Sequence, residues 1–131
     1  MENPMHGATL FWFRRDLRLS DNAGLYHALK SSKRVYCAFI FDRDILDQLP
    51  SKQDRRVEFI RESLVELHAA LQSHGGGLIV RHASARKAIP ALAAELKVDA
   101  VFTNEDYEPA AVARDAEVAA ALQAQGIGFE A

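Results

Sequence analysis

Short runs of apolar residues alternate along the chain with stretches in which apolar residues recur at every third or fourth position. The runs are rich in β-branched and aromatic residues, as in strands buried on both faces of a parallel sheet. They lie at residues 8–13, 35–41, 78–80, 98–103 and 126–130. Because the stretches between them have helical spacing, the pattern predicts the order βαβαβαβαβ. With right-handed crossovers, this is a three-layer Rossmann-like α/β fold: a five-stranded parallel sheet of order 3-2-1-4-5 with helices on both faces.

The longest helical pattern extends from about residue 54 to residue 74. Its apolar residues fall on one side of the helix, and charged residues occupy the remaining positions. The apolar stripe consists of Val57, Ile60, Leu64, Leu67 and Leu71. We expect this stripe to pack on one face of the sheet.

Polar residues and prolines mark the ends of the other helices. Ser20 and Asp21 are expected to cap the helix that precedes residue 35, and Ser84 to cap the helix that follows residue 80. Pro90 predicts a kink or a delayed start in the latter helix. Pro109 suits the first turn of the last helix, which runs to about residue 125.

The length and composition of the chain are typical of one folded domain. The chain has 131 residues, of which 49% are hydrophobic and 26% charged. We place the domain at residues 8–131, with residues 1–7 as a flexible lead-in. A formal charge of -2 argues against a dedicated nucleic-acid or membrane-surface binder. A single cysteine, no secretory leader and no apolar run near the roughly 20 residues of a membrane span favour a cytoplasmic protein that does not enter membranes.

The loops expected at the switch point of the sheet carry opposite charges. In an open parallel sheet, ligands bind at the carboxyl ends of the strands where the strand order reverses. With the predicted order, the loops there are the basic Arg14–Arg18 (RRDLR) and the acidic Asn104–Glu108 (NEDYE). One interpretation is mutual neutralisation in partly solvated ion pairs, worth roughly 0–1 kcal/mol each. The other is that Arg14, Arg15 or Arg18 grips a ligand phosphate or another domain.

Several common reaction centres have no counterpart in the sequence. The turn after the first strand contains no glycine, which excludes the dinucleotide fingerprint and the Walker loop. The five histidines lack metal-ligand spacing, and no serine lies in a Gly-x-Ser-x-Gly elbow. We therefore expect no catalytic residue and no metal site, and we interpret Trp12 and Cys37 as core residues.

The segment Leu10–Leu25 (LFWFRRDLRLSDNAGL) closely resembles the opening of the DNA photolyase/cryptochrome family, whose first strand and following loop carry a W-x-R-R-D-L-R-x-x-D-N pattern. Further segments match the family in the same order and at similar spacing. They are 39–42 (FIFD), 56–64 (RVEFIRESL), 77–80 (GLIV) and 104–115 (NEDYEPAAVARD). The resemblance extends from residue 8 to the end of the chain, and an array of motifs is far more specific than any one of them.

The resemblance implies the amino-terminal α/β domain of a bacterial deoxyribodipyrimidine photo-lyase, an enzyme that repairs cyclobutane pyrimidine dimers in UV-damaged DNA with blue light. In that family a larger helical domain binds FAD, flips the damaged dimer out of the DNA and splits it by light-driven electron transfer. These 131 residues do not contain that domain. We expect the helical FAD-binding domain of the same protein as partner, and damaged DNA through it. The chain alone is then a non-catalytic light-harvesting and docking domain.

The family also suggests which antenna chromophore the domain takes. In members with a folate antenna, an Asn-Glu pair contacts the pterin, and Ala110 and Ala111 stand at those positions here. The resemblance therefore favours a deazaflavin or flavin over methenyltetrahydrofolate. A pocket that binds no chromophore is the remaining alternative. Members of the favoured type seat the ring between the loops after the second and fourth strands. The matching residues are Phe41, Asp42, Arg43, Asp44, Arg56, Asn104, Glu105 and Asp106.

The RRDLR loop has a second meaning under the resemblance. It matches a segment that lies against the partner domain, so we assign Arg14, Arg15, Asp16 and Arg18 to interdomain architecture first and to a ligand second. Two alternatives to a photolyase remain. One is a cryptochrome photoreceptor domain, and the other is a stand-alone nucleotide- or flavin-binding domain similar to stress-protein or electron-transfer flavoprotein domains. The abrupt end after the fifth strand favours the first domain of a longer protein.

Overall fold

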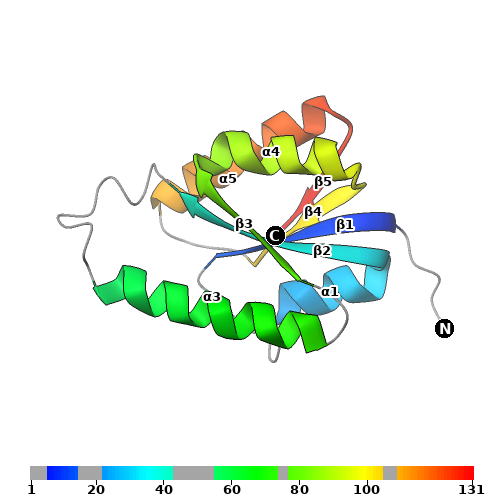
Figure 1. Ribbon diagram of the computed structural model, residues 1–131. Helices are drawn as coiled ribbons and strands as arrows, with labels where there is room; N and C mark the ends of the chain where they lie inside the picture. The colour runs from blue at the N-terminus through cyan, green and yellow to red at the C-terminus, as the bar shows by residue number, and fades with distance from the viewer. Residues whose placement is uncertain (1–5, 15–21, 43–54, 74–76, 105–108) are drawn as a thin grey trace.

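Strands and helices alternate along the chain as the apolar pattern predicts (Figure 1). The computed structural model describes residues 6–14, 22–42, 55–73, 77–104 and 109–131. The elements are β1 (His6–Phe13), α1 (Ala23–Ser31), β2 (Ser32–Asp42), α3 (Arg55–Ser73), β3 (Leu78–Ala83), α4 (Ala85–Leu96), β4 (Ala100–Phe102), α5 (Pro109–Ala124) and β5 (Gly128–Glu130). No helix among these residues is long and apolar enough to cross a membrane.

The strands form one five-stranded sheet of order β3-β2-β1-β4-β5, and each neighbouring pair is parallel. In the register, Phe11 of β1 lies between Cys37 of β2 and Phe102 of β4. α1 and α3 cover one face of the sheet, and α4 and α5 cover the other (Figure 1). The predicted fold class and strand order are confirmed.

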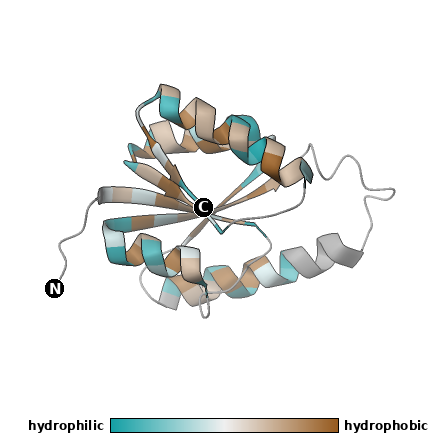
Figure 2. Ribbon diagram, turned by 180° about the vertical axis from the view of Figure 1, so that it is seen from behind, coloured by the Kyte–Doolittle hydropathy of each residue, from teal (hydrophilic) through white to brown (hydrophobic). Residues whose placement is uncertain are grey.

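Successive side chains of a strand point to opposite faces of the sheet, so the buried residues form two apolar clusters, one on each face. These clusters hold the three layers together. Leu10 and Trp12 pack with the α4 and α5 layer, whereas Phe11 and Phe13 pack with the α1 and α3 layer. Figure 2 shows the hydrophobic residues concentrated along the strands. Trp12 is 2% exposed, and Cys37 is also buried, so both are core residues as expected. Burial raises the pKa of the Cys37 thiol to about 11.

The first helix and the second strand begin at other residues than expected. The α1 cap is Asn22, whose Oδ1 accepts a hydrogen bond from the Leu25 N–H. The predicted caps at positions 20 and 21 lie outside the described residues. β2 begins at Ser32 rather than Val35, because Ser32 already pairs with His6 and its hydroxyl is 2.8 Å from that of Thr9. Pairing with β1 thus extends β2 over the polar residues 32–34.

The remaining helices follow the sequence pattern closely. In α3 the stripe residues Leu64, Leu67 and Leu71 are buried, while the side chains at 57 and 60 lie outside the described residues. α4 starts directly after Ser84, whose side chain makes no capping hydrogen bond, and it continues through Pro90, so the expected delay is absent. The Pro90 ring is buried, and this packing offsets the missing backbone donor.

Candidate functional site

The switch point of the sheet lies between β1 and β4. These strands are neighbours, yet α1 follows β1 on one face and α5 follows β4 on the other. At their carboxyl ends, the Thr103 hydroxyl donates a hydrogen bond of 2.9 Å to the carbonyl oxygen of Trp12. This bond fixes the exits of the two strands relative to each other, so the residues that follow are held at a defined position.

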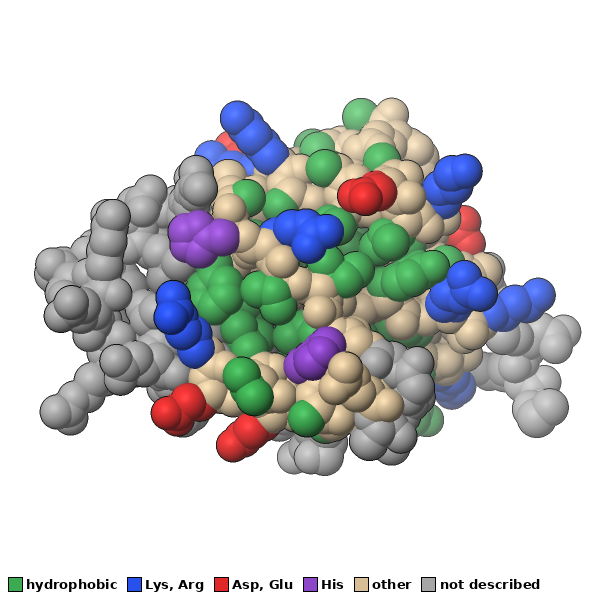
Figure 3. Space-filling model, in the orientation of Figure 1, with side chains coloured by type: hydrophobic (Ala, Val, Ile, Leu, Met, Phe, Trp, Pro, Cys, Tyr) green, Lys and Arg blue, Asp and Glu red, His purple; other side chains and the backbone are tan. Residues whose placement is uncertain are grey.

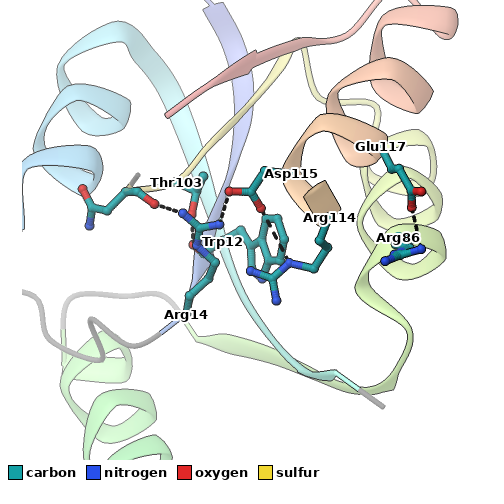
Figure 4. A network of polar contacts seen from close by, with 8 residues as sticks. Trp12, Arg14, Arg86, Thr103, Arg114, Asp115 and Glu117 are labelled. Atoms are coloured by element: carbon teal, nitrogen blue, oxygen red, sulfur yellow. Dashed lines mark hydrogen bonds and ion pairs between the residues drawn. The ribbon is translucent and has the colours of Figure 1, made fainter. Parts of the chain in front are cut away.

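Arg14 fills the space directly after β1. Its Nη1 donates to Asp115 Oδ2 on α5 at 2.5 Å, and its Nη2 donates to the backbone carbonyl of Asn104 (Figure 4). Only 7% of the Arg14 side chain and 14% of the Asp115 side chain are exposed. A single guanidinium therefore joins β1, the exit of β4 and α5, and it is shielded from water.

A second guanidinium lies beside the same group. Arg114 places its Cζ 4.9 Å from the centre of the Trp12 ring, and Arg14 places its own 5.1 Å from that ring. Arg114 Nε is 3.6 Å from Asp115 Oδ1, an ion-pair distance (Figure 4). Desolvated contacts between guanidinium and indole stabilise a fold by about 0.5–2 kcal/mol each. Trp12, Arg14, Arg114 and Asp115 form one buried unit, here called the Trp12 cluster.

Asn104 ties the exit of β4 to the start of α1. Its Oδ1 accepts from the Gly24 N–H at 2.7 Å, and its Nδ2 donates to Asn22 Oδ1 at 2.7 Å. A Cβ on Gly24 would lie 2.6 Å from Asn104 Oδ1 and 2.9 Å from the Phe11 ring, so only glycine fits there. Asn104 therefore links the end of β4 to the start of α1.

Phe41 lies apart from Asn104 at the same edge of the sheet. β1 separates β2 from β4, so the two residues are two strand spacings apart, or about 10 Å. The half-buried Phe41 ring is 5.0 Å from that of Phe39 and 5.9 Å from that of His82. It lies on the face of the sheet covered by α1 and α3.

The other predicted site residues lie partly or wholly outside the described residues. Asp42 ends β2 and Arg56 lies in the first turn of α3, but their side chains are not described. Residues 15–21, 43–54 and 105–108 lie wholly outside the described residues. These ranges contain Arg15, Asp16, Arg18, Arg43, Asp44, Glu105 and Asp106. Within the described part of the chain, no three metal-ligating side chains form a group.

The role of the Trp12 cluster was not predicted. Arg14 was assigned to interdomain architecture first and to a ligand second, and within the described residues it contacts Asp115 and the backbone carbonyl of Asn104, the first residue of the acidic loop. The sequence held one signal of this. The buried positions of α5 are Ala111, Arg114, Val118 and Leu122, so an arginine occupies an apolar stripe. A charged residue at such a position needs a buried partner.

Comparison with known proteins identifies relatives of known class. The chain is 41% identical over 123 residues to a deoxyribodipyrimidine photo-lyase of Synechococcus sp., covering 94% of this chain and 25% of the relative. It is 33% identical over 122 residues to a cryptochrome DASH of Natronomonas pharaonis, covering 90% of this chain and 26% of the relative. The chain therefore spans about a quarter of the length of these relatives.

A solved structure shows the same fold. An archaeal photolyase from Sulfolobus tokodaii superimposes with a TM-score of 0.86 at 39% identity, covering 94% of this chain and 28% of that one. That structure contains two FAD molecules and is described as implying a novel light-harvesting cofactor. Residues 9–131 also match the DNA photolyase family. The sheet order, the motifs and these matches together place the chain in the DNA photolyase family.

Proposed function

We propose that residues 8–131 are the light-harvesting and docking domain of a photolyase that repairs cyclobutane pyrimidine dimers with blue light. The main support is the Sulfolobus photolyase, which is similar over 94% of this chain, is much longer, and holds two FAD molecules. In this proposal one flavin is the reactive cofactor of a helical partner domain, which also contacts the damaged DNA. The other corresponds to an antenna held by the α/β domain.

We propose that the antenna site lies at the carboxyl ends of the strands, on the face of the sheet that α1 and α3 cover. In this proposal Phe41 supplies an aromatic floor, and the polar and charged contacts are assigned to residues 42–44, 56, 105 and 106. When bound, the chromophore absorbs light and passes the excitation to the flavin of the partner domain. Arg14 joins the end of β1 to the end of β4, and Asn104 joins the end of β4 to the start of α1.

The alanines on α5 support a flavin or deazaflavin over methenyltetrahydrofolate. Ala110 is exposed and Ala111 is 4% exposed, and both lie in the first turn of α5. A methyl group gives a pterin ring no hydrogen bond, so the polar edge of a folate would lose its partners in that mode. An isoalloxazine ring held against Phe41 does not depend on these positions.

Fluorescence titration of the purified chain tests the antenna proposal. The ligands are a deazaflavin, FMN, FAD and a reduced folate, each added to the same protein preparation. We expect a deazaflavin or flavin to bind at least tenfold more tightly than the folate, or about 1.4 kcal/mol. Tightest binding by the folate, or no saturable binding at all, would contradict the proposal.

A substitution locates the site. Phe41→Ala removes the aromatic floor and should weaken flavin binding about tenfold. The control is Tyr26→Ala, because Tyr26 is an aromatic residue on α1 that is 61% exposed. Circular dichroism confirms that both variants remain folded. Equal affinities of the two variants would place the chromophore elsewhere.

A cryptochrome photoreceptor is the second candidate, supported by the similarity to cryptochrome DASH. The two candidates differ in what the full-length protein does. A photolyase restores a thymine-dimer oligonucleotide under blue light, whereas a photoreceptor leaves the dimer intact. Assay of the full-length protein therefore separates the two.

A further inference from the structure

β3 is an edge strand that is poorly covered. It pairs with β2 on one side and ends the sheet on the other. Its Val80 is 40% exposed, and the positions after it, Arg81 and His82, are exposed as well. An edge strand presents a row of backbone donors and acceptors that can pair with another extended chain.

An apolar groove runs beside this strand. It has a volume of about 430 Å³ and is lined by Phe41, Arg61, Leu64, Val65, His68, Leu78 and Val80. Figure 3 shows hydrophobic side chains gathered in the open between α3 and β3, with basic, histidine and acidic side chains around them. Val65 is 70% exposed, so the groove continues onto the surface of α3.

The two faces of β3 differ in chemistry, because side chains alternate along a strand. Leu78 and Val80 line the groove, whereas Ile79 packs with the α4 layer. By the same alternation Arg81 lies on the α4 side of the sheet. The groove itself carries Arg61 at its rim, and none of its lining residues in the described part of the chain is acidic.

We propose that β3 and this groove bind an extended polypeptide segment in which valine-like residues alternate with acidic residues. The segment adds a sixth strand to the sheet, as in other cases of strand addition. Its apolar side chains then enter the groove, and its carboxylates lie on the opposite face beside Arg81. Apolar and acidic residues alternate in the partner, just as residues facing the groove and residues facing α4 alternate in β3.

A second copy of the chain does not fit this edge. Two-fold pairing of β3 with itself places both Arg81 side chains on the same face of the joined sheet. They would lie opposite or diagonal to each other, and like charges in such pairs are destabilising. The charge at this edge therefore favours an acidic partner.

The test uses the 131-residue chain and a designed probe. The probe is a blocked eight-residue peptide of alternating glutamate and valine, and the control peptide carries lysine in place of glutamate. Calorimetry should detect saturable binding of the glutamate peptide and none of the lysine peptide. Arg81→Glu should reverse this preference, whereas Lys87→Glu, which changes an exposed cation on α4 rather than on β3, should preserve it.

A matched pair of valines tests the groove. Val65→Glu should weaken binding of the glutamate peptide at least tenfold. Val112→Glu should leave it unchanged, because Val112 is 51% exposed on α5. Absence of saturable binding, equal binding of both peptides, or equal effects of the two valine variants would overturn the proposal. A dimer that is detected by sedimentation and abolished by Val65→Glu would also overturn the proposal. Phe41 belongs both to this groove and to the proposed antenna site, whereas Val65 and Arg81 lie outside that site. The Val65 and Arg81 variants therefore test peptide binding, and the flavin titration of the unmodified chain tests the antenna.

Discussion

At the scale of single residues, charge inside the Trp12 cluster decides stability. Asp115 faces two guanidinium groups, at 2.5 Å from Arg14 and 3.6 Å from Arg114, with little access to water. Burying these charges costs free energy, and the carboxylate offsets much of that cost. Arg86 and Glu117 form a pair of similar length at 2.8 Å, but their side chains are 44% and 56% exposed. The two pairs provide an internal comparison of burial.

Asp115→Asn should therefore destabilise the chain far more than Glu117→Gln. Removing one partner of a buried pair costs about 3–5 kcal/mol, whereas an exposed pair contributes about 0–1 kcal/mol. Urea unfolding measures the difference, and the fluorescence of the single tryptophan, buried Trp12, reports it. Equal shifts in the two variants would show that the Trp12 cluster tolerates an uncompensated charge.

Burial of Cys37 predicts how stability changes with pH. The pKa of this thiol rises from 9.0 to about 11 on folding, because burial disfavours the thiolate. Below pH 9 the thiol is neutral in both states, and above it the unfolded chain ionises first. Relative to Cys37→Ala, the wild type should lose about 1.4 kcal/mol per pH unit between pH 9 and pH 11. A difference in unfolding free energy that stays constant over this range would contradict the prediction.

At the scale of elements, one close contact joins α1 to β4. Gly24→Ala would raise the helix propensity of α1 by about 0.5–1 kcal/mol, yet its Cβ would lie 2.6 Å from Asn104 Oδ1. We expect the variant to be at least about 1 kcal/mol less stable. The cost should shrink in an Asn104→Ala background, where the amide is absent, and the Phe11 contact should leave a remainder. A double-mutant cycle by urea unfolding measures the coupling, and strictly additive effects would exclude it.

The elements also show what could be predicted from the sequence. Apolar runs such as residues 8–13 indicate buried strands by local composition, so the alternation and strand order were predictable. The polar start of β2 at Ser32 was not, because its pairing with β1 overrides local propensity. Phe41 lies near the carboxyl end of β2, and its role in a site stays a prediction. The Arg14–Asp115 pair joins residues 101 positions apart, and no local pattern encodes such a contact.

At the scale of the whole molecule, the two faces of the sheet carry separate apolar clusters, and one of them contains the single tryptophan of the sequence. Helices cover both faces of the sheet, and both apolar clusters are buried. The sequence contains one tryptophan, Trp12, and two guanidinium groups lie about 5 Å from its ring. Positive charge near an indole disfavours the radical cation that forms when it gives up an electron. These two charges thus disfavour Trp12 as an electron donor to a flavin.

This leads to a prediction for the isolated domain. On the function proposed above, the 131-residue chain, mixed with FAD and a thymine-dimer oligonucleotide, should give no repair under blue light, whereas a longer photolyase that contains it should restore the oligonucleotide. Two controls sharpen the comparison: a dark sample, and the isolated chain with FMN, whose absorbance should show no photoreduction beyond that of free FMN. Chromatography of the oligonucleotide measures repair. Repair by the isolated chain would mean that Trp12 or another group in this domain supplies the electron, and the division of labour between two domains would have to be abandoned.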